Sequence, residues 1–155
     1  MKLEAIKIDK LNPEFKFEVA QQPGGANIKN CFACGACTGG CPVSEIDNDF
    51  DPRKIIRMVL LGFKEKVLSS DFIWYCIECY TCSFHCPQDV KFREIMGVLR
   101  QMAEKEGYVH HSFINNMKEV GRSSQLLRHK MVEKILVKKT EDYKVEPEDL
   151  LVNNY

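Results

Sequence analysis

The chain has 155 residues and balances 22 Lys and Arg against 22 Asp and Glu, so its formal net charge is zero. This balance gives no electrostatic reason to expect binding to nucleic acid or to an acidic membrane surface. The longest strongly apolar stretch, residues 55–63, contains Arg57 and Gly62 and is far too short to span a bilayer. We therefore expect one domain, soluble or peripheral, with no membrane span.

Residues 1–30 are expected to form an N-terminal extension with short strands. Apolar and polar residues alternate over residues 3–8 and again over residues 15–19, which is the period of a strand with one buried face. Asn12 and Pro13 lie between the two stretches and predict a turn.

A run of four cysteines follows this extension. Its spacing is C-x-x-C-x-x-C-x-x-x-C-P. The cysteines are Cys31, Cys34, Cys37 and Cys41, and Pro42 follows the last of them. Pro42 has no N–H group and a fixed φ angle, so we expect it to end the cysteine loop and redirect the chain. Gly35, Gly39 and Gly40 allow close backbone approach and positive φ angles within the run.

Helical signals fill the next segment. Asp51 is a good N-cap, and Pro52 suits the first position of a helix. Apolar residues then recur at helical spacing from Ile55 to Phe63, and Gly62 is a plausible stop. The sequence predicts a helix of roughly ten residues here, followed by a short helix over residues 64–69.

The second run repeats the spacing of the first, and its members are Cys76, Cys79, Cys82, Cys86 and Pro87. All eight cysteines of the chain belong to the two runs. Beyond the second run, the apolar residues from Phe92 to Met102 share one helix face, which Gly107 ends. Two further helical stretches carry Phe113 to Val120 and Leu126 to Leu136. Residues 139–155 lose this periodicity and are expected to be mobile or to dock on a partner.

Eight cysteines in this arrangement indicate iron-sulfur clusters. A cubane cluster has four iron corners, and thiolates suit them better than imidazoles or carboxylates do. Structural zinc is one alternative, but its cysteines usually form two separated C-x-x-C pairs. Disulfides are the other alternative, but no signal peptide is expected, and cysteines three apart are poorly placed to pair.

The two runs resemble the bacterial ferredoxin run, in which three closely spaced thiolates hold one cluster and the fourth ligates the cluster of the other run. The resemblance implies two 4Fe-4S clusters with crossed ligation. Cluster 1 would take Cys31, Cys34, Cys37 and Cys86. Cluster 2 would take Cys76, Cys79, Cys82 and Cys41.

The residues around the cysteines are similar to the alpha-helical ferredoxin domains and, within them, to the C subunits of heterodisulfide reductases. The similarity lies in residues 31–43, in the helical spacer that begins at Asp51, and in residues 74–87. It implies a mainly α fold, with an alpha-helical ferredoxin domain over residues 31–138.

That family implies a non-catalytic electron-transfer subunit of a cytoplasmic oxidoreductase complex in methanogenesis. Electrons would pass from an A subunit, which carries flavin and iron-sulfur clusters, to a B subunit that reduces the mixed disulfide of coenzyme M and coenzyme B. A hydrogenase or formate dehydrogenase module is a further candidate partner. The chain itself would hold no catalytic residue, because every cysteine is committed to a cluster and no G-x-G-x-x-G follows a predicted strand.

Other functions stay open at this point. The chain could be an iron-sulfur subunit of a heterodisulfide reductase-like or quinone-linked oxidoreductase, or a diffusible ferredoxin, although its neutral charge disfavours the last. From another class, it could be a structural zinc module.

Several side chains near the runs have two interpretations each. His85 either tunes a cluster through a hydrogen bond or is simply solvated. Four aromatic side chains either shield the clusters from water or pack in the core. These aromatic residues are Trp74, Tyr75, Tyr80 and Phe84. Four basic side chains have two interpretations: they offset cluster charge or bind a partner, or they simply lie on solvated faces. These basic residues are Lys29, Arg53, Lys91 and Arg93.

Overall fold

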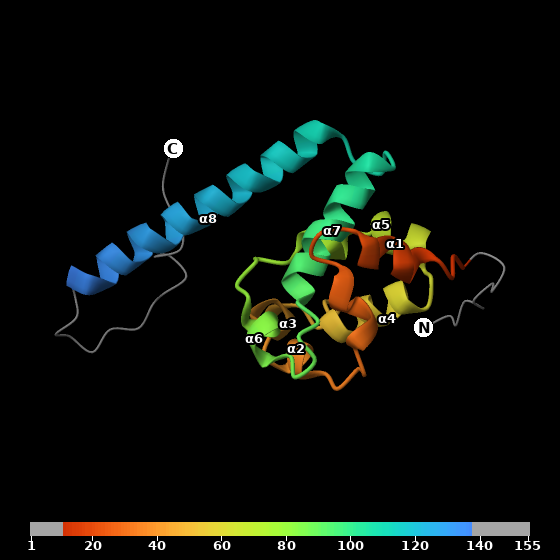
Figure 1. The fold of residues 1–155 in the computed structure, drawn as a ribbon. Coiled ribbons are helices and arrows are strands. Elements are labelled where there is room, and N and C mark those ends of the chain that lie inside the picture. The colour runs from red at the N-terminus through yellow and green to blue at the C-terminus, as the bar shows by residue number, and fades with distance from the viewer. Residues whose placement is uncertain (1–10, 138–155) are drawn as a thin grey trace. The chain divides into compact units, whose positions relative to one another are not determined.

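Short helices and loops carry the chain from residue 11 to residue 137, which are the residues that the computed structural model describes (Figure 1). All regular secondary structure among these residues is helical, which confirms the mainly α prediction. The chain divides into two units, residues 1–110 and residues 111–155, and each is described by itself. Both the stretch 3–8, predicted as a strand, and the tail 139–155 lie outside the described residues.

The first unit consists of seven α-helices and two 3₁₀ helices within its described part. In chain order they are α1 (Phe15–Gln21), η2 (Ala26–Asn30), α2 (Ala36–Gly39), α3 (Pro42–Ile46), α4 (Pro52–Leu60), α5 (Lys64–Leu68), η3 (Asp71–Trp74), α6 (Thr81–His85) and α7 (Phe92–Lys105). The short helices α2, α3 and α6 gather together near the first turns of α7 (Figure 1). Helix α2 contacts α6 and α4, and α6 contacts α7. The cysteines lie in and around these short helices.

The strand predicted over residues 15–19 is wrong, because these residues form helix α1. Phe15 and Val19 are four residues apart and share one helix face, where both are fully buried. Phe17 lies on another face with 39% of its surface exposed. The turn predicted at Asn12 and Pro13 is present, because the Phe15 N–H donates to the Asn12 carbonyl oxygen at 3.1 Å, but it leads into a helix and not between two strands. An alternation over five residues is too short to distinguish the period of a strand from that of a helix.

Helix α4 follows its sequence prediction closely. The Asp51 carboxylate accepts a hydrogen bond from the Lys54 N–H at 3.1 Å and so caps the helix, while Pro52 occupies its first position. The helix ends before Gly62, whose φ of 86° is unfavourable for any other residue. Ile55, Ile56 and Val59 form its buried face.

Helix α7 supplies the largest apolar face of the first unit. The apolar residues predicted to share a face are all buried, and they are Phe92, Ile95, Met96, Leu99 and Met102. The helix contacts α1, α5, α6 and η3, so its face is the surface on which much of the unit packs. Fully burying one such side chain contributes about 1.5–3 kcal/mol.

One lysine joins three parts of this unit. Lys64, at the start of α5, makes ion pairs with Glu18 of α1 at 2.7 Å and with Glu106 at the end of α7 at 2.8 Å. Partial burial alone would lower the pKa of Lys64, but the two carboxylates outweigh it and raise that pKa. The hydrogen bond from Lys64 likewise lowers the pKa of Glu18.

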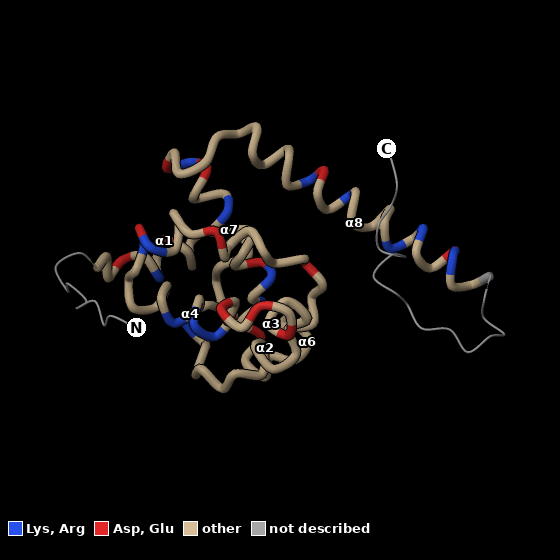
Figure 2. Tube along the Cα trace, turned by 180° about the vertical axis from the view of Figure 1, so that it is seen from behind, with Lys and Arg blue, Asp and Glu red and all other residues tan. Residues whose placement is uncertain are grey.

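The described part of the second unit is a single helix, α8 (His111–Val137), where two helical stretches were expected. Gly121 lies between those stretches, but a glycine inside a helix costs only about 1 kcal/mol and need not end it. Figure 2 shows that basic residues outnumber acidic ones along α8. They are Lys118, Arg122, Arg128, Lys130 and Lys134, against Glu119 and Glu133.

Replacing Gly62 by alanine is expected to destabilise the first unit by about 1–3 kcal/mol, because the new residue keeps a strained positive φ. In addition, its Cβ would lie 2.4 Å from the Asn12 carbonyl oxygen. Gly97→Ala is the matched control, since α7 leaves open space there and alanine favours a helix. Anaerobic thermal unfolding followed by circular dichroism measures both. Equal midpoints for the two variants would contradict the prediction.

Candidate metal centre

The two cysteine runs adopt the same unusual backbone conformation. They begin at residues 31 and 76, and matched positions have positive φ angles: 60° at Ala33 and 57° at Glu78, then 88° at Gly35 and 64° at Tyr80. Residues other than glycine rarely adopt such angles, and they persist where the surroundings impose them. Their repetition indicates that both loops are shaped for the same task.

A short helix follows each loop, and the two helices pack on each other along a seam. Helices α2 and α6 contact each other. A Cβ atom on Gly40 would lie 2.4 Å from Nδ1 of His85, so the imidazole ring occupies the space that the glycine leaves. Gly35 needs its freedom because of its positive φ, whereas Gly39 has open space and no such angle. Two of the three expected glycine roles are therefore present.

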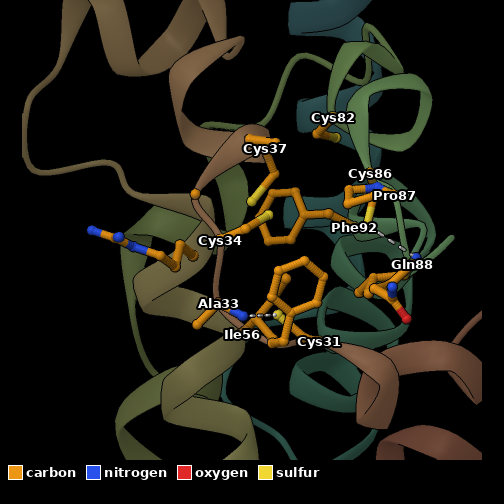
Figure 3. A pocket seen from close by; sticks show the side chains of 15 residues that line it. Cys31, Ala33, Cys34, Cys37, Ile56, Cys82, Cys86, Pro87, Gln88 and Phe92 are labelled. Atoms are coloured by element: carbon orange, nitrogen blue, oxygen red, sulfur yellow. Dashed lines mark hydrogen bonds between the residues drawn. The ribbon is translucent and has the colours of Figure 1, made fainter.

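A first cavity of about 390 Å³, partly open to solvent, lies against the first loop. Figure 3 shows the cysteines of this loop around it together with Cys86, which comes from the second run. Ile56 of α4 and Phe92 of α7 form apolar walls. The cysteines that line it are Cys31, Cys34, Cys37, Cys82 and Cys86.

A second cavity, of about 310 Å³, lies against the second loop. Its cysteines are Cys76, Cys79, Cys82 and Cys41, the last of which belongs to the first run. Cys82 and Phe92 line both cavities, so the cavities adjoin. The second cavity thus gathers three cysteines of the second run and the fourth cysteine of the first. The first cavity gathers three cysteines of the first run and the fourth cysteine of the second, together with Cys82.

The donor chemistry of these cavities fits iron-sulfur clusters. All eight cysteines are free thiols, and thiolates are the ligands that such clusters use. Within residues 11–137, no three Cys, His, Asp or Glu side chains converge where a single metal ion would sit. The thiols instead surround two cavities with apolar walls.

Burial holds several of these thiols in the protonated form. It raises the pKa of Cys37 and of Cys76. It also raises the pKa of Cys82 to about 11, an effect to which the neighbouring Cys76 and Cys79 thiols add. A metal centre reverses this preference, because coordination to a cation deprotonates a thiol.

Hydroxyl groups at matched positions tie each loop to the helix behind it. Thr38 donates a hydrogen bond to Asp51 at 2.6 Å and accepts one from the backbone N–H of Arg53 at 3.1 Å. Ser83 stands at the corresponding position of the second run and donates to Glu94 of α7 at 3.2 Å. These hydrogen bonds therefore link the first run to the start of α4 and the second run to α7.

The four aromatic side chains near the cysteine runs lie in different environments in the structure. Trp74 is 9% exposed and belongs to the core, whereas Tyr80 lines the second cavity. Tyr75 is half exposed, and Phe84, with 88% of its surface exposed, fits neither interpretation. Nothing in the described residues explains the exposure of Phe84.

The four basic side chains near the cysteine runs also lie in different environments. Arg53 lines the first cavity and Arg93 lines the second. Lys91 makes an exposed ion pair with Asp89 at 3.4 Å, and the Lys29 ammonium lies 5.4 Å from the centre of the Phe17 ring. The two arginines are thus the members that the structure brings to the cavities.

Sequence reasoning missed Arg100 and Glu78. Arg100 of α7 donates hydrogen bonds to the carbonyl oxygens of Ile73 and Cys76, both at 2.8 Å, and to the Glu78 carboxylate at 2.6 Å. Its sequence signal is weak, because an arginine after the apolar Leu99 looks like the edge of a solvated face. Backbone carbonyls leave no trace in a sequence pattern.

The comparisons with known proteins agree with this geometry. The model of the family described as "4Fe-4S dicluster domain" matches residues 30–91, which contain all eight cysteines. Residues 30–91 therefore belong to the 4Fe-4S dicluster domains, as the two cysteine runs predict.

Three relatives show how far the similarity extends. The chain is 43% identical over 112 residues to the second iron-sulfur C subunit of CoB–CoM heterodisulfide reductase from Methanocaldococcus jannaschii, covering 68% of this chain and 59% of the relative. It is 42% identical over 109 residues to the C2 subunit of H₂/formate:CoB-CoM heterodisulfide,ferredoxin reductase from Methanococcus maripaludis, covering 66% and 58%. It is 35% identical over 104 residues to the C subunit of H₂:CoB-CoM heterodisulfide,ferredoxin reductase from Methanothermobacter marburgensis, covering 67% and 55%.

The chain matches less than two thirds of the length of these relatives. Among the helices of residues 11–137, none has both the length and the apolar character needed to cross a membrane.

Replacing Gly40 by alanine is expected to reduce the iron and labile sulfide bound per chain, because the added methyl group displaces His85 from the seam. Gly39→Ala should bind as much as the parent, since open space surrounds that position. Adding His85→Ala to the Gly40 variant should restore the content by making room. Iron and sulfide assays after anaerobic purification measure all three, and a Gly40→Ala variant with full content would refute the expectation.

Proposed function

We propose that this chain is an electron-transfer subunit of a heterodisulfide reductase complex. It would relay electrons through two 4Fe-4S clusters, from a flavin-containing subunit to the subunit that reduces the coenzyme M–coenzyme B heterodisulfide. The observation that carries this proposal is the arrangement of all eight cysteines around two adjoining cavities. The names of the relatives, which are heterodisulfide reductase subunits, support it.

The ligand sets follow the lining of the cavities. We assign Cys31, Cys34, Cys37 and Cys86 to cluster 1, and Cys76, Cys79, Cys82 and Cys41 to cluster 2. Cys82 lines both cavities, and two observations favour its assignment to cluster 2. The Cys76 and Cys79 thiols both raise the pKa of Cys82, and the first cavity has four cysteines without it.

The residues of the chain suit conduction and leave disulfide reduction to a partner. A 4Fe-4S cluster accepts and releases single electrons. Apolar side chains line both cavities, and Phe92 lines the two of them. No thiol remains to attack a disulfide once all eight are ligands, so the catalytic site belongs to another subunit.

The partners in this proposal are a flavin and iron-sulfur A subunit and a disulfide-reducing B subunit. A hydrogenase or formate dehydrogenase module is a further partner, which the H₂/formate name of the Methanococcus maripaludis relative supports. We assign the dicluster function to residues 31–138 and place the complex in the cytoplasm, because free thiols and clusters require a reducing compartment.

Pairs of cysteine replacements distinguish crossed from uncrossed ligation. Cys34→Ala with Cys86→Ala removes two ligands of one cluster, so about half of the iron should remain. Cys34→Ala with Cys41→Ala damages both clusters and should remove nearly all of it. Iron per chain after anaerobic reconstitution is the measurement.

Uncrossed ligation predicts the reverse result for the two pairs. The single variants are the controls, since each should lose about half of the iron in either case. Retained iron in the Cys34/Cys41 pair and none in the Cys34/Cys86 pair would overturn the assignment.

The function itself is tested by anaerobic purification of the full chain with the proteins that accompany it. We expect broad visible absorption, paramagnetic signals from two 4Fe-4S clusters after reduction, and recovery with a flavoprotein and a cysteine-rich subunit. Reduction of the isolated complex should be followed by oxidation of its clusters when the heterodisulfide is added. Zinc in place of iron would sink the proposal, as would clusters that stay reduced in the presence of heterodisulfide.

A further inference from the structure

We propose that an ion-pair network formed by Arg93, Glu78 and Arg100 sets the reduction potential of cluster 2 independently of cluster 1. This inference rests on the proposed function and adds specific tuning residues to it. Arg100 and Glu78 act through their charges beside the loop that carries Cys76 and Cys79, and neither lines the second cavity itself.

The network is centred on the second cysteine loop. Glu78 lies between Cys76 and Cys79, and one of its carboxylate oxygens accepts a hydrogen bond from Arg100 at 2.6 Å. The other oxygen accepts from Arg93. The two arginines are seven residues apart on α7, which places them on the same face of the helix.

Arg100 also fixes the backbone that enters the loop. Its guanidinium donates to the carbonyl oxygens of Ile73 and Cys76 at 2.8 Å and to that of Trp74 at 3.5 Å. The same group lies 5.7 Å from the centre of the Trp74 ring. Only 17% of the Arg100 side chain is exposed, so solvent screens its charge less than it screens a surface charge.

Arg93 brings the network to the cavity itself. It lines the second cavity, and its guanidinium lies 5.0 Å from the centre of the Tyr80 ring. Its Nε is buried and has no hydrogen-bond partner among residues 11–137, which leaves a donor for a sulfur atom of a bound cluster.

The first loop is built differently. Ala33 stands where the second loop has Glu78, so this position carries no carboxylate in the first loop. The first cavity is lined by Arg53 instead, whose guanidinium would lie 3.5 Å from a Cβ atom on Gly35. The charges near the two cavities therefore sit on different residues and can be changed one cavity at a time.

The charge of each side chain decides the direction in which its removal shifts the reduction potential. Reduction adds an electron to a cluster, so a nearby cation favours the reduced form and a nearby anion opposes it.

Redox titration of the anaerobically purified full chain, followed by electron paramagnetic resonance, tests the proposal. Arg100→Gln should shift one of the two reduction steps to a more negative potential. Glu78→Gln should shift the same step to a more positive potential, although both variants break the same ion pair. Arg53→Gln should move the other step, to a more negative potential. The matched control is Arg57→Gln, an exposed arginine of α4, which should move neither.

The opposite signs separate electrostatic tuning from distortion of the loop. Shifts of Arg100→Gln and Glu78→Gln in the same direction, equal shifts of both steps, or no shift would each overturn the proposal. If Arg100→Gln fails to hold cluster 2, the nearly isosteric Glu78→Gln decides the question alone. Absence of two-cluster signals in the parent chain would instead refute the proposed function.

Discussion

The whole of the first unit depends on one constraint: neither cysteine run can surround a cavity alone. Three thiols fit into a tight loop with positive φ angles, but the fourth has to come from a distant part of the chain. The two runs must therefore face each other, and they do so where α2 contacts α6 and the His85 ring lies against Gly40. Helices α4 and α7 stand behind the loops and provide the apolar walls, Ile56 and Phe92. The remaining helices pack on this arrangement.

Much of this arrangement was predictable, because its determinants are local in the sequence. Thiol spacing predicted the cysteines that line the two cavities, and the Asp51-Pro52 cap and the apolar face from Phe92 to Met102 located α4 and α7. The first described helix was not predictable in the same way. Five alternating residues satisfy a strand period and also place Phe15 and Val19 one helical turn apart, and only the tertiary core decides between them.

The missed features share a different cause. The contacts of Arg100 with backbone carbonyls depend on how α7 crosses the segment before Cys76, and side-chain patterns contain no information about carbonyl positions. The continuity of α8 was also missed, because Gly121 interrupts the apolar pattern without ending the helix. Sequence reasoning thus located the cysteines that line the cavities and the helices behind them, whereas the polar contacts that distinguish the two loops required coordinates.

The position of Cys86 in the first cavity has a consequence for biosynthesis. With the ligand sets proposed above, a nascent chain that has exposed Cys31, Cys34 and Cys37 still lacks the fourth ligand of cluster 1. That ligand emerges from the ribosome only after the entire second run has been translated. Cluster insertion would then follow synthesis of the domain instead of accompanying it, and a chain truncated just before Cys86 would keep all four ligands of cluster 2 but only three of cluster 1.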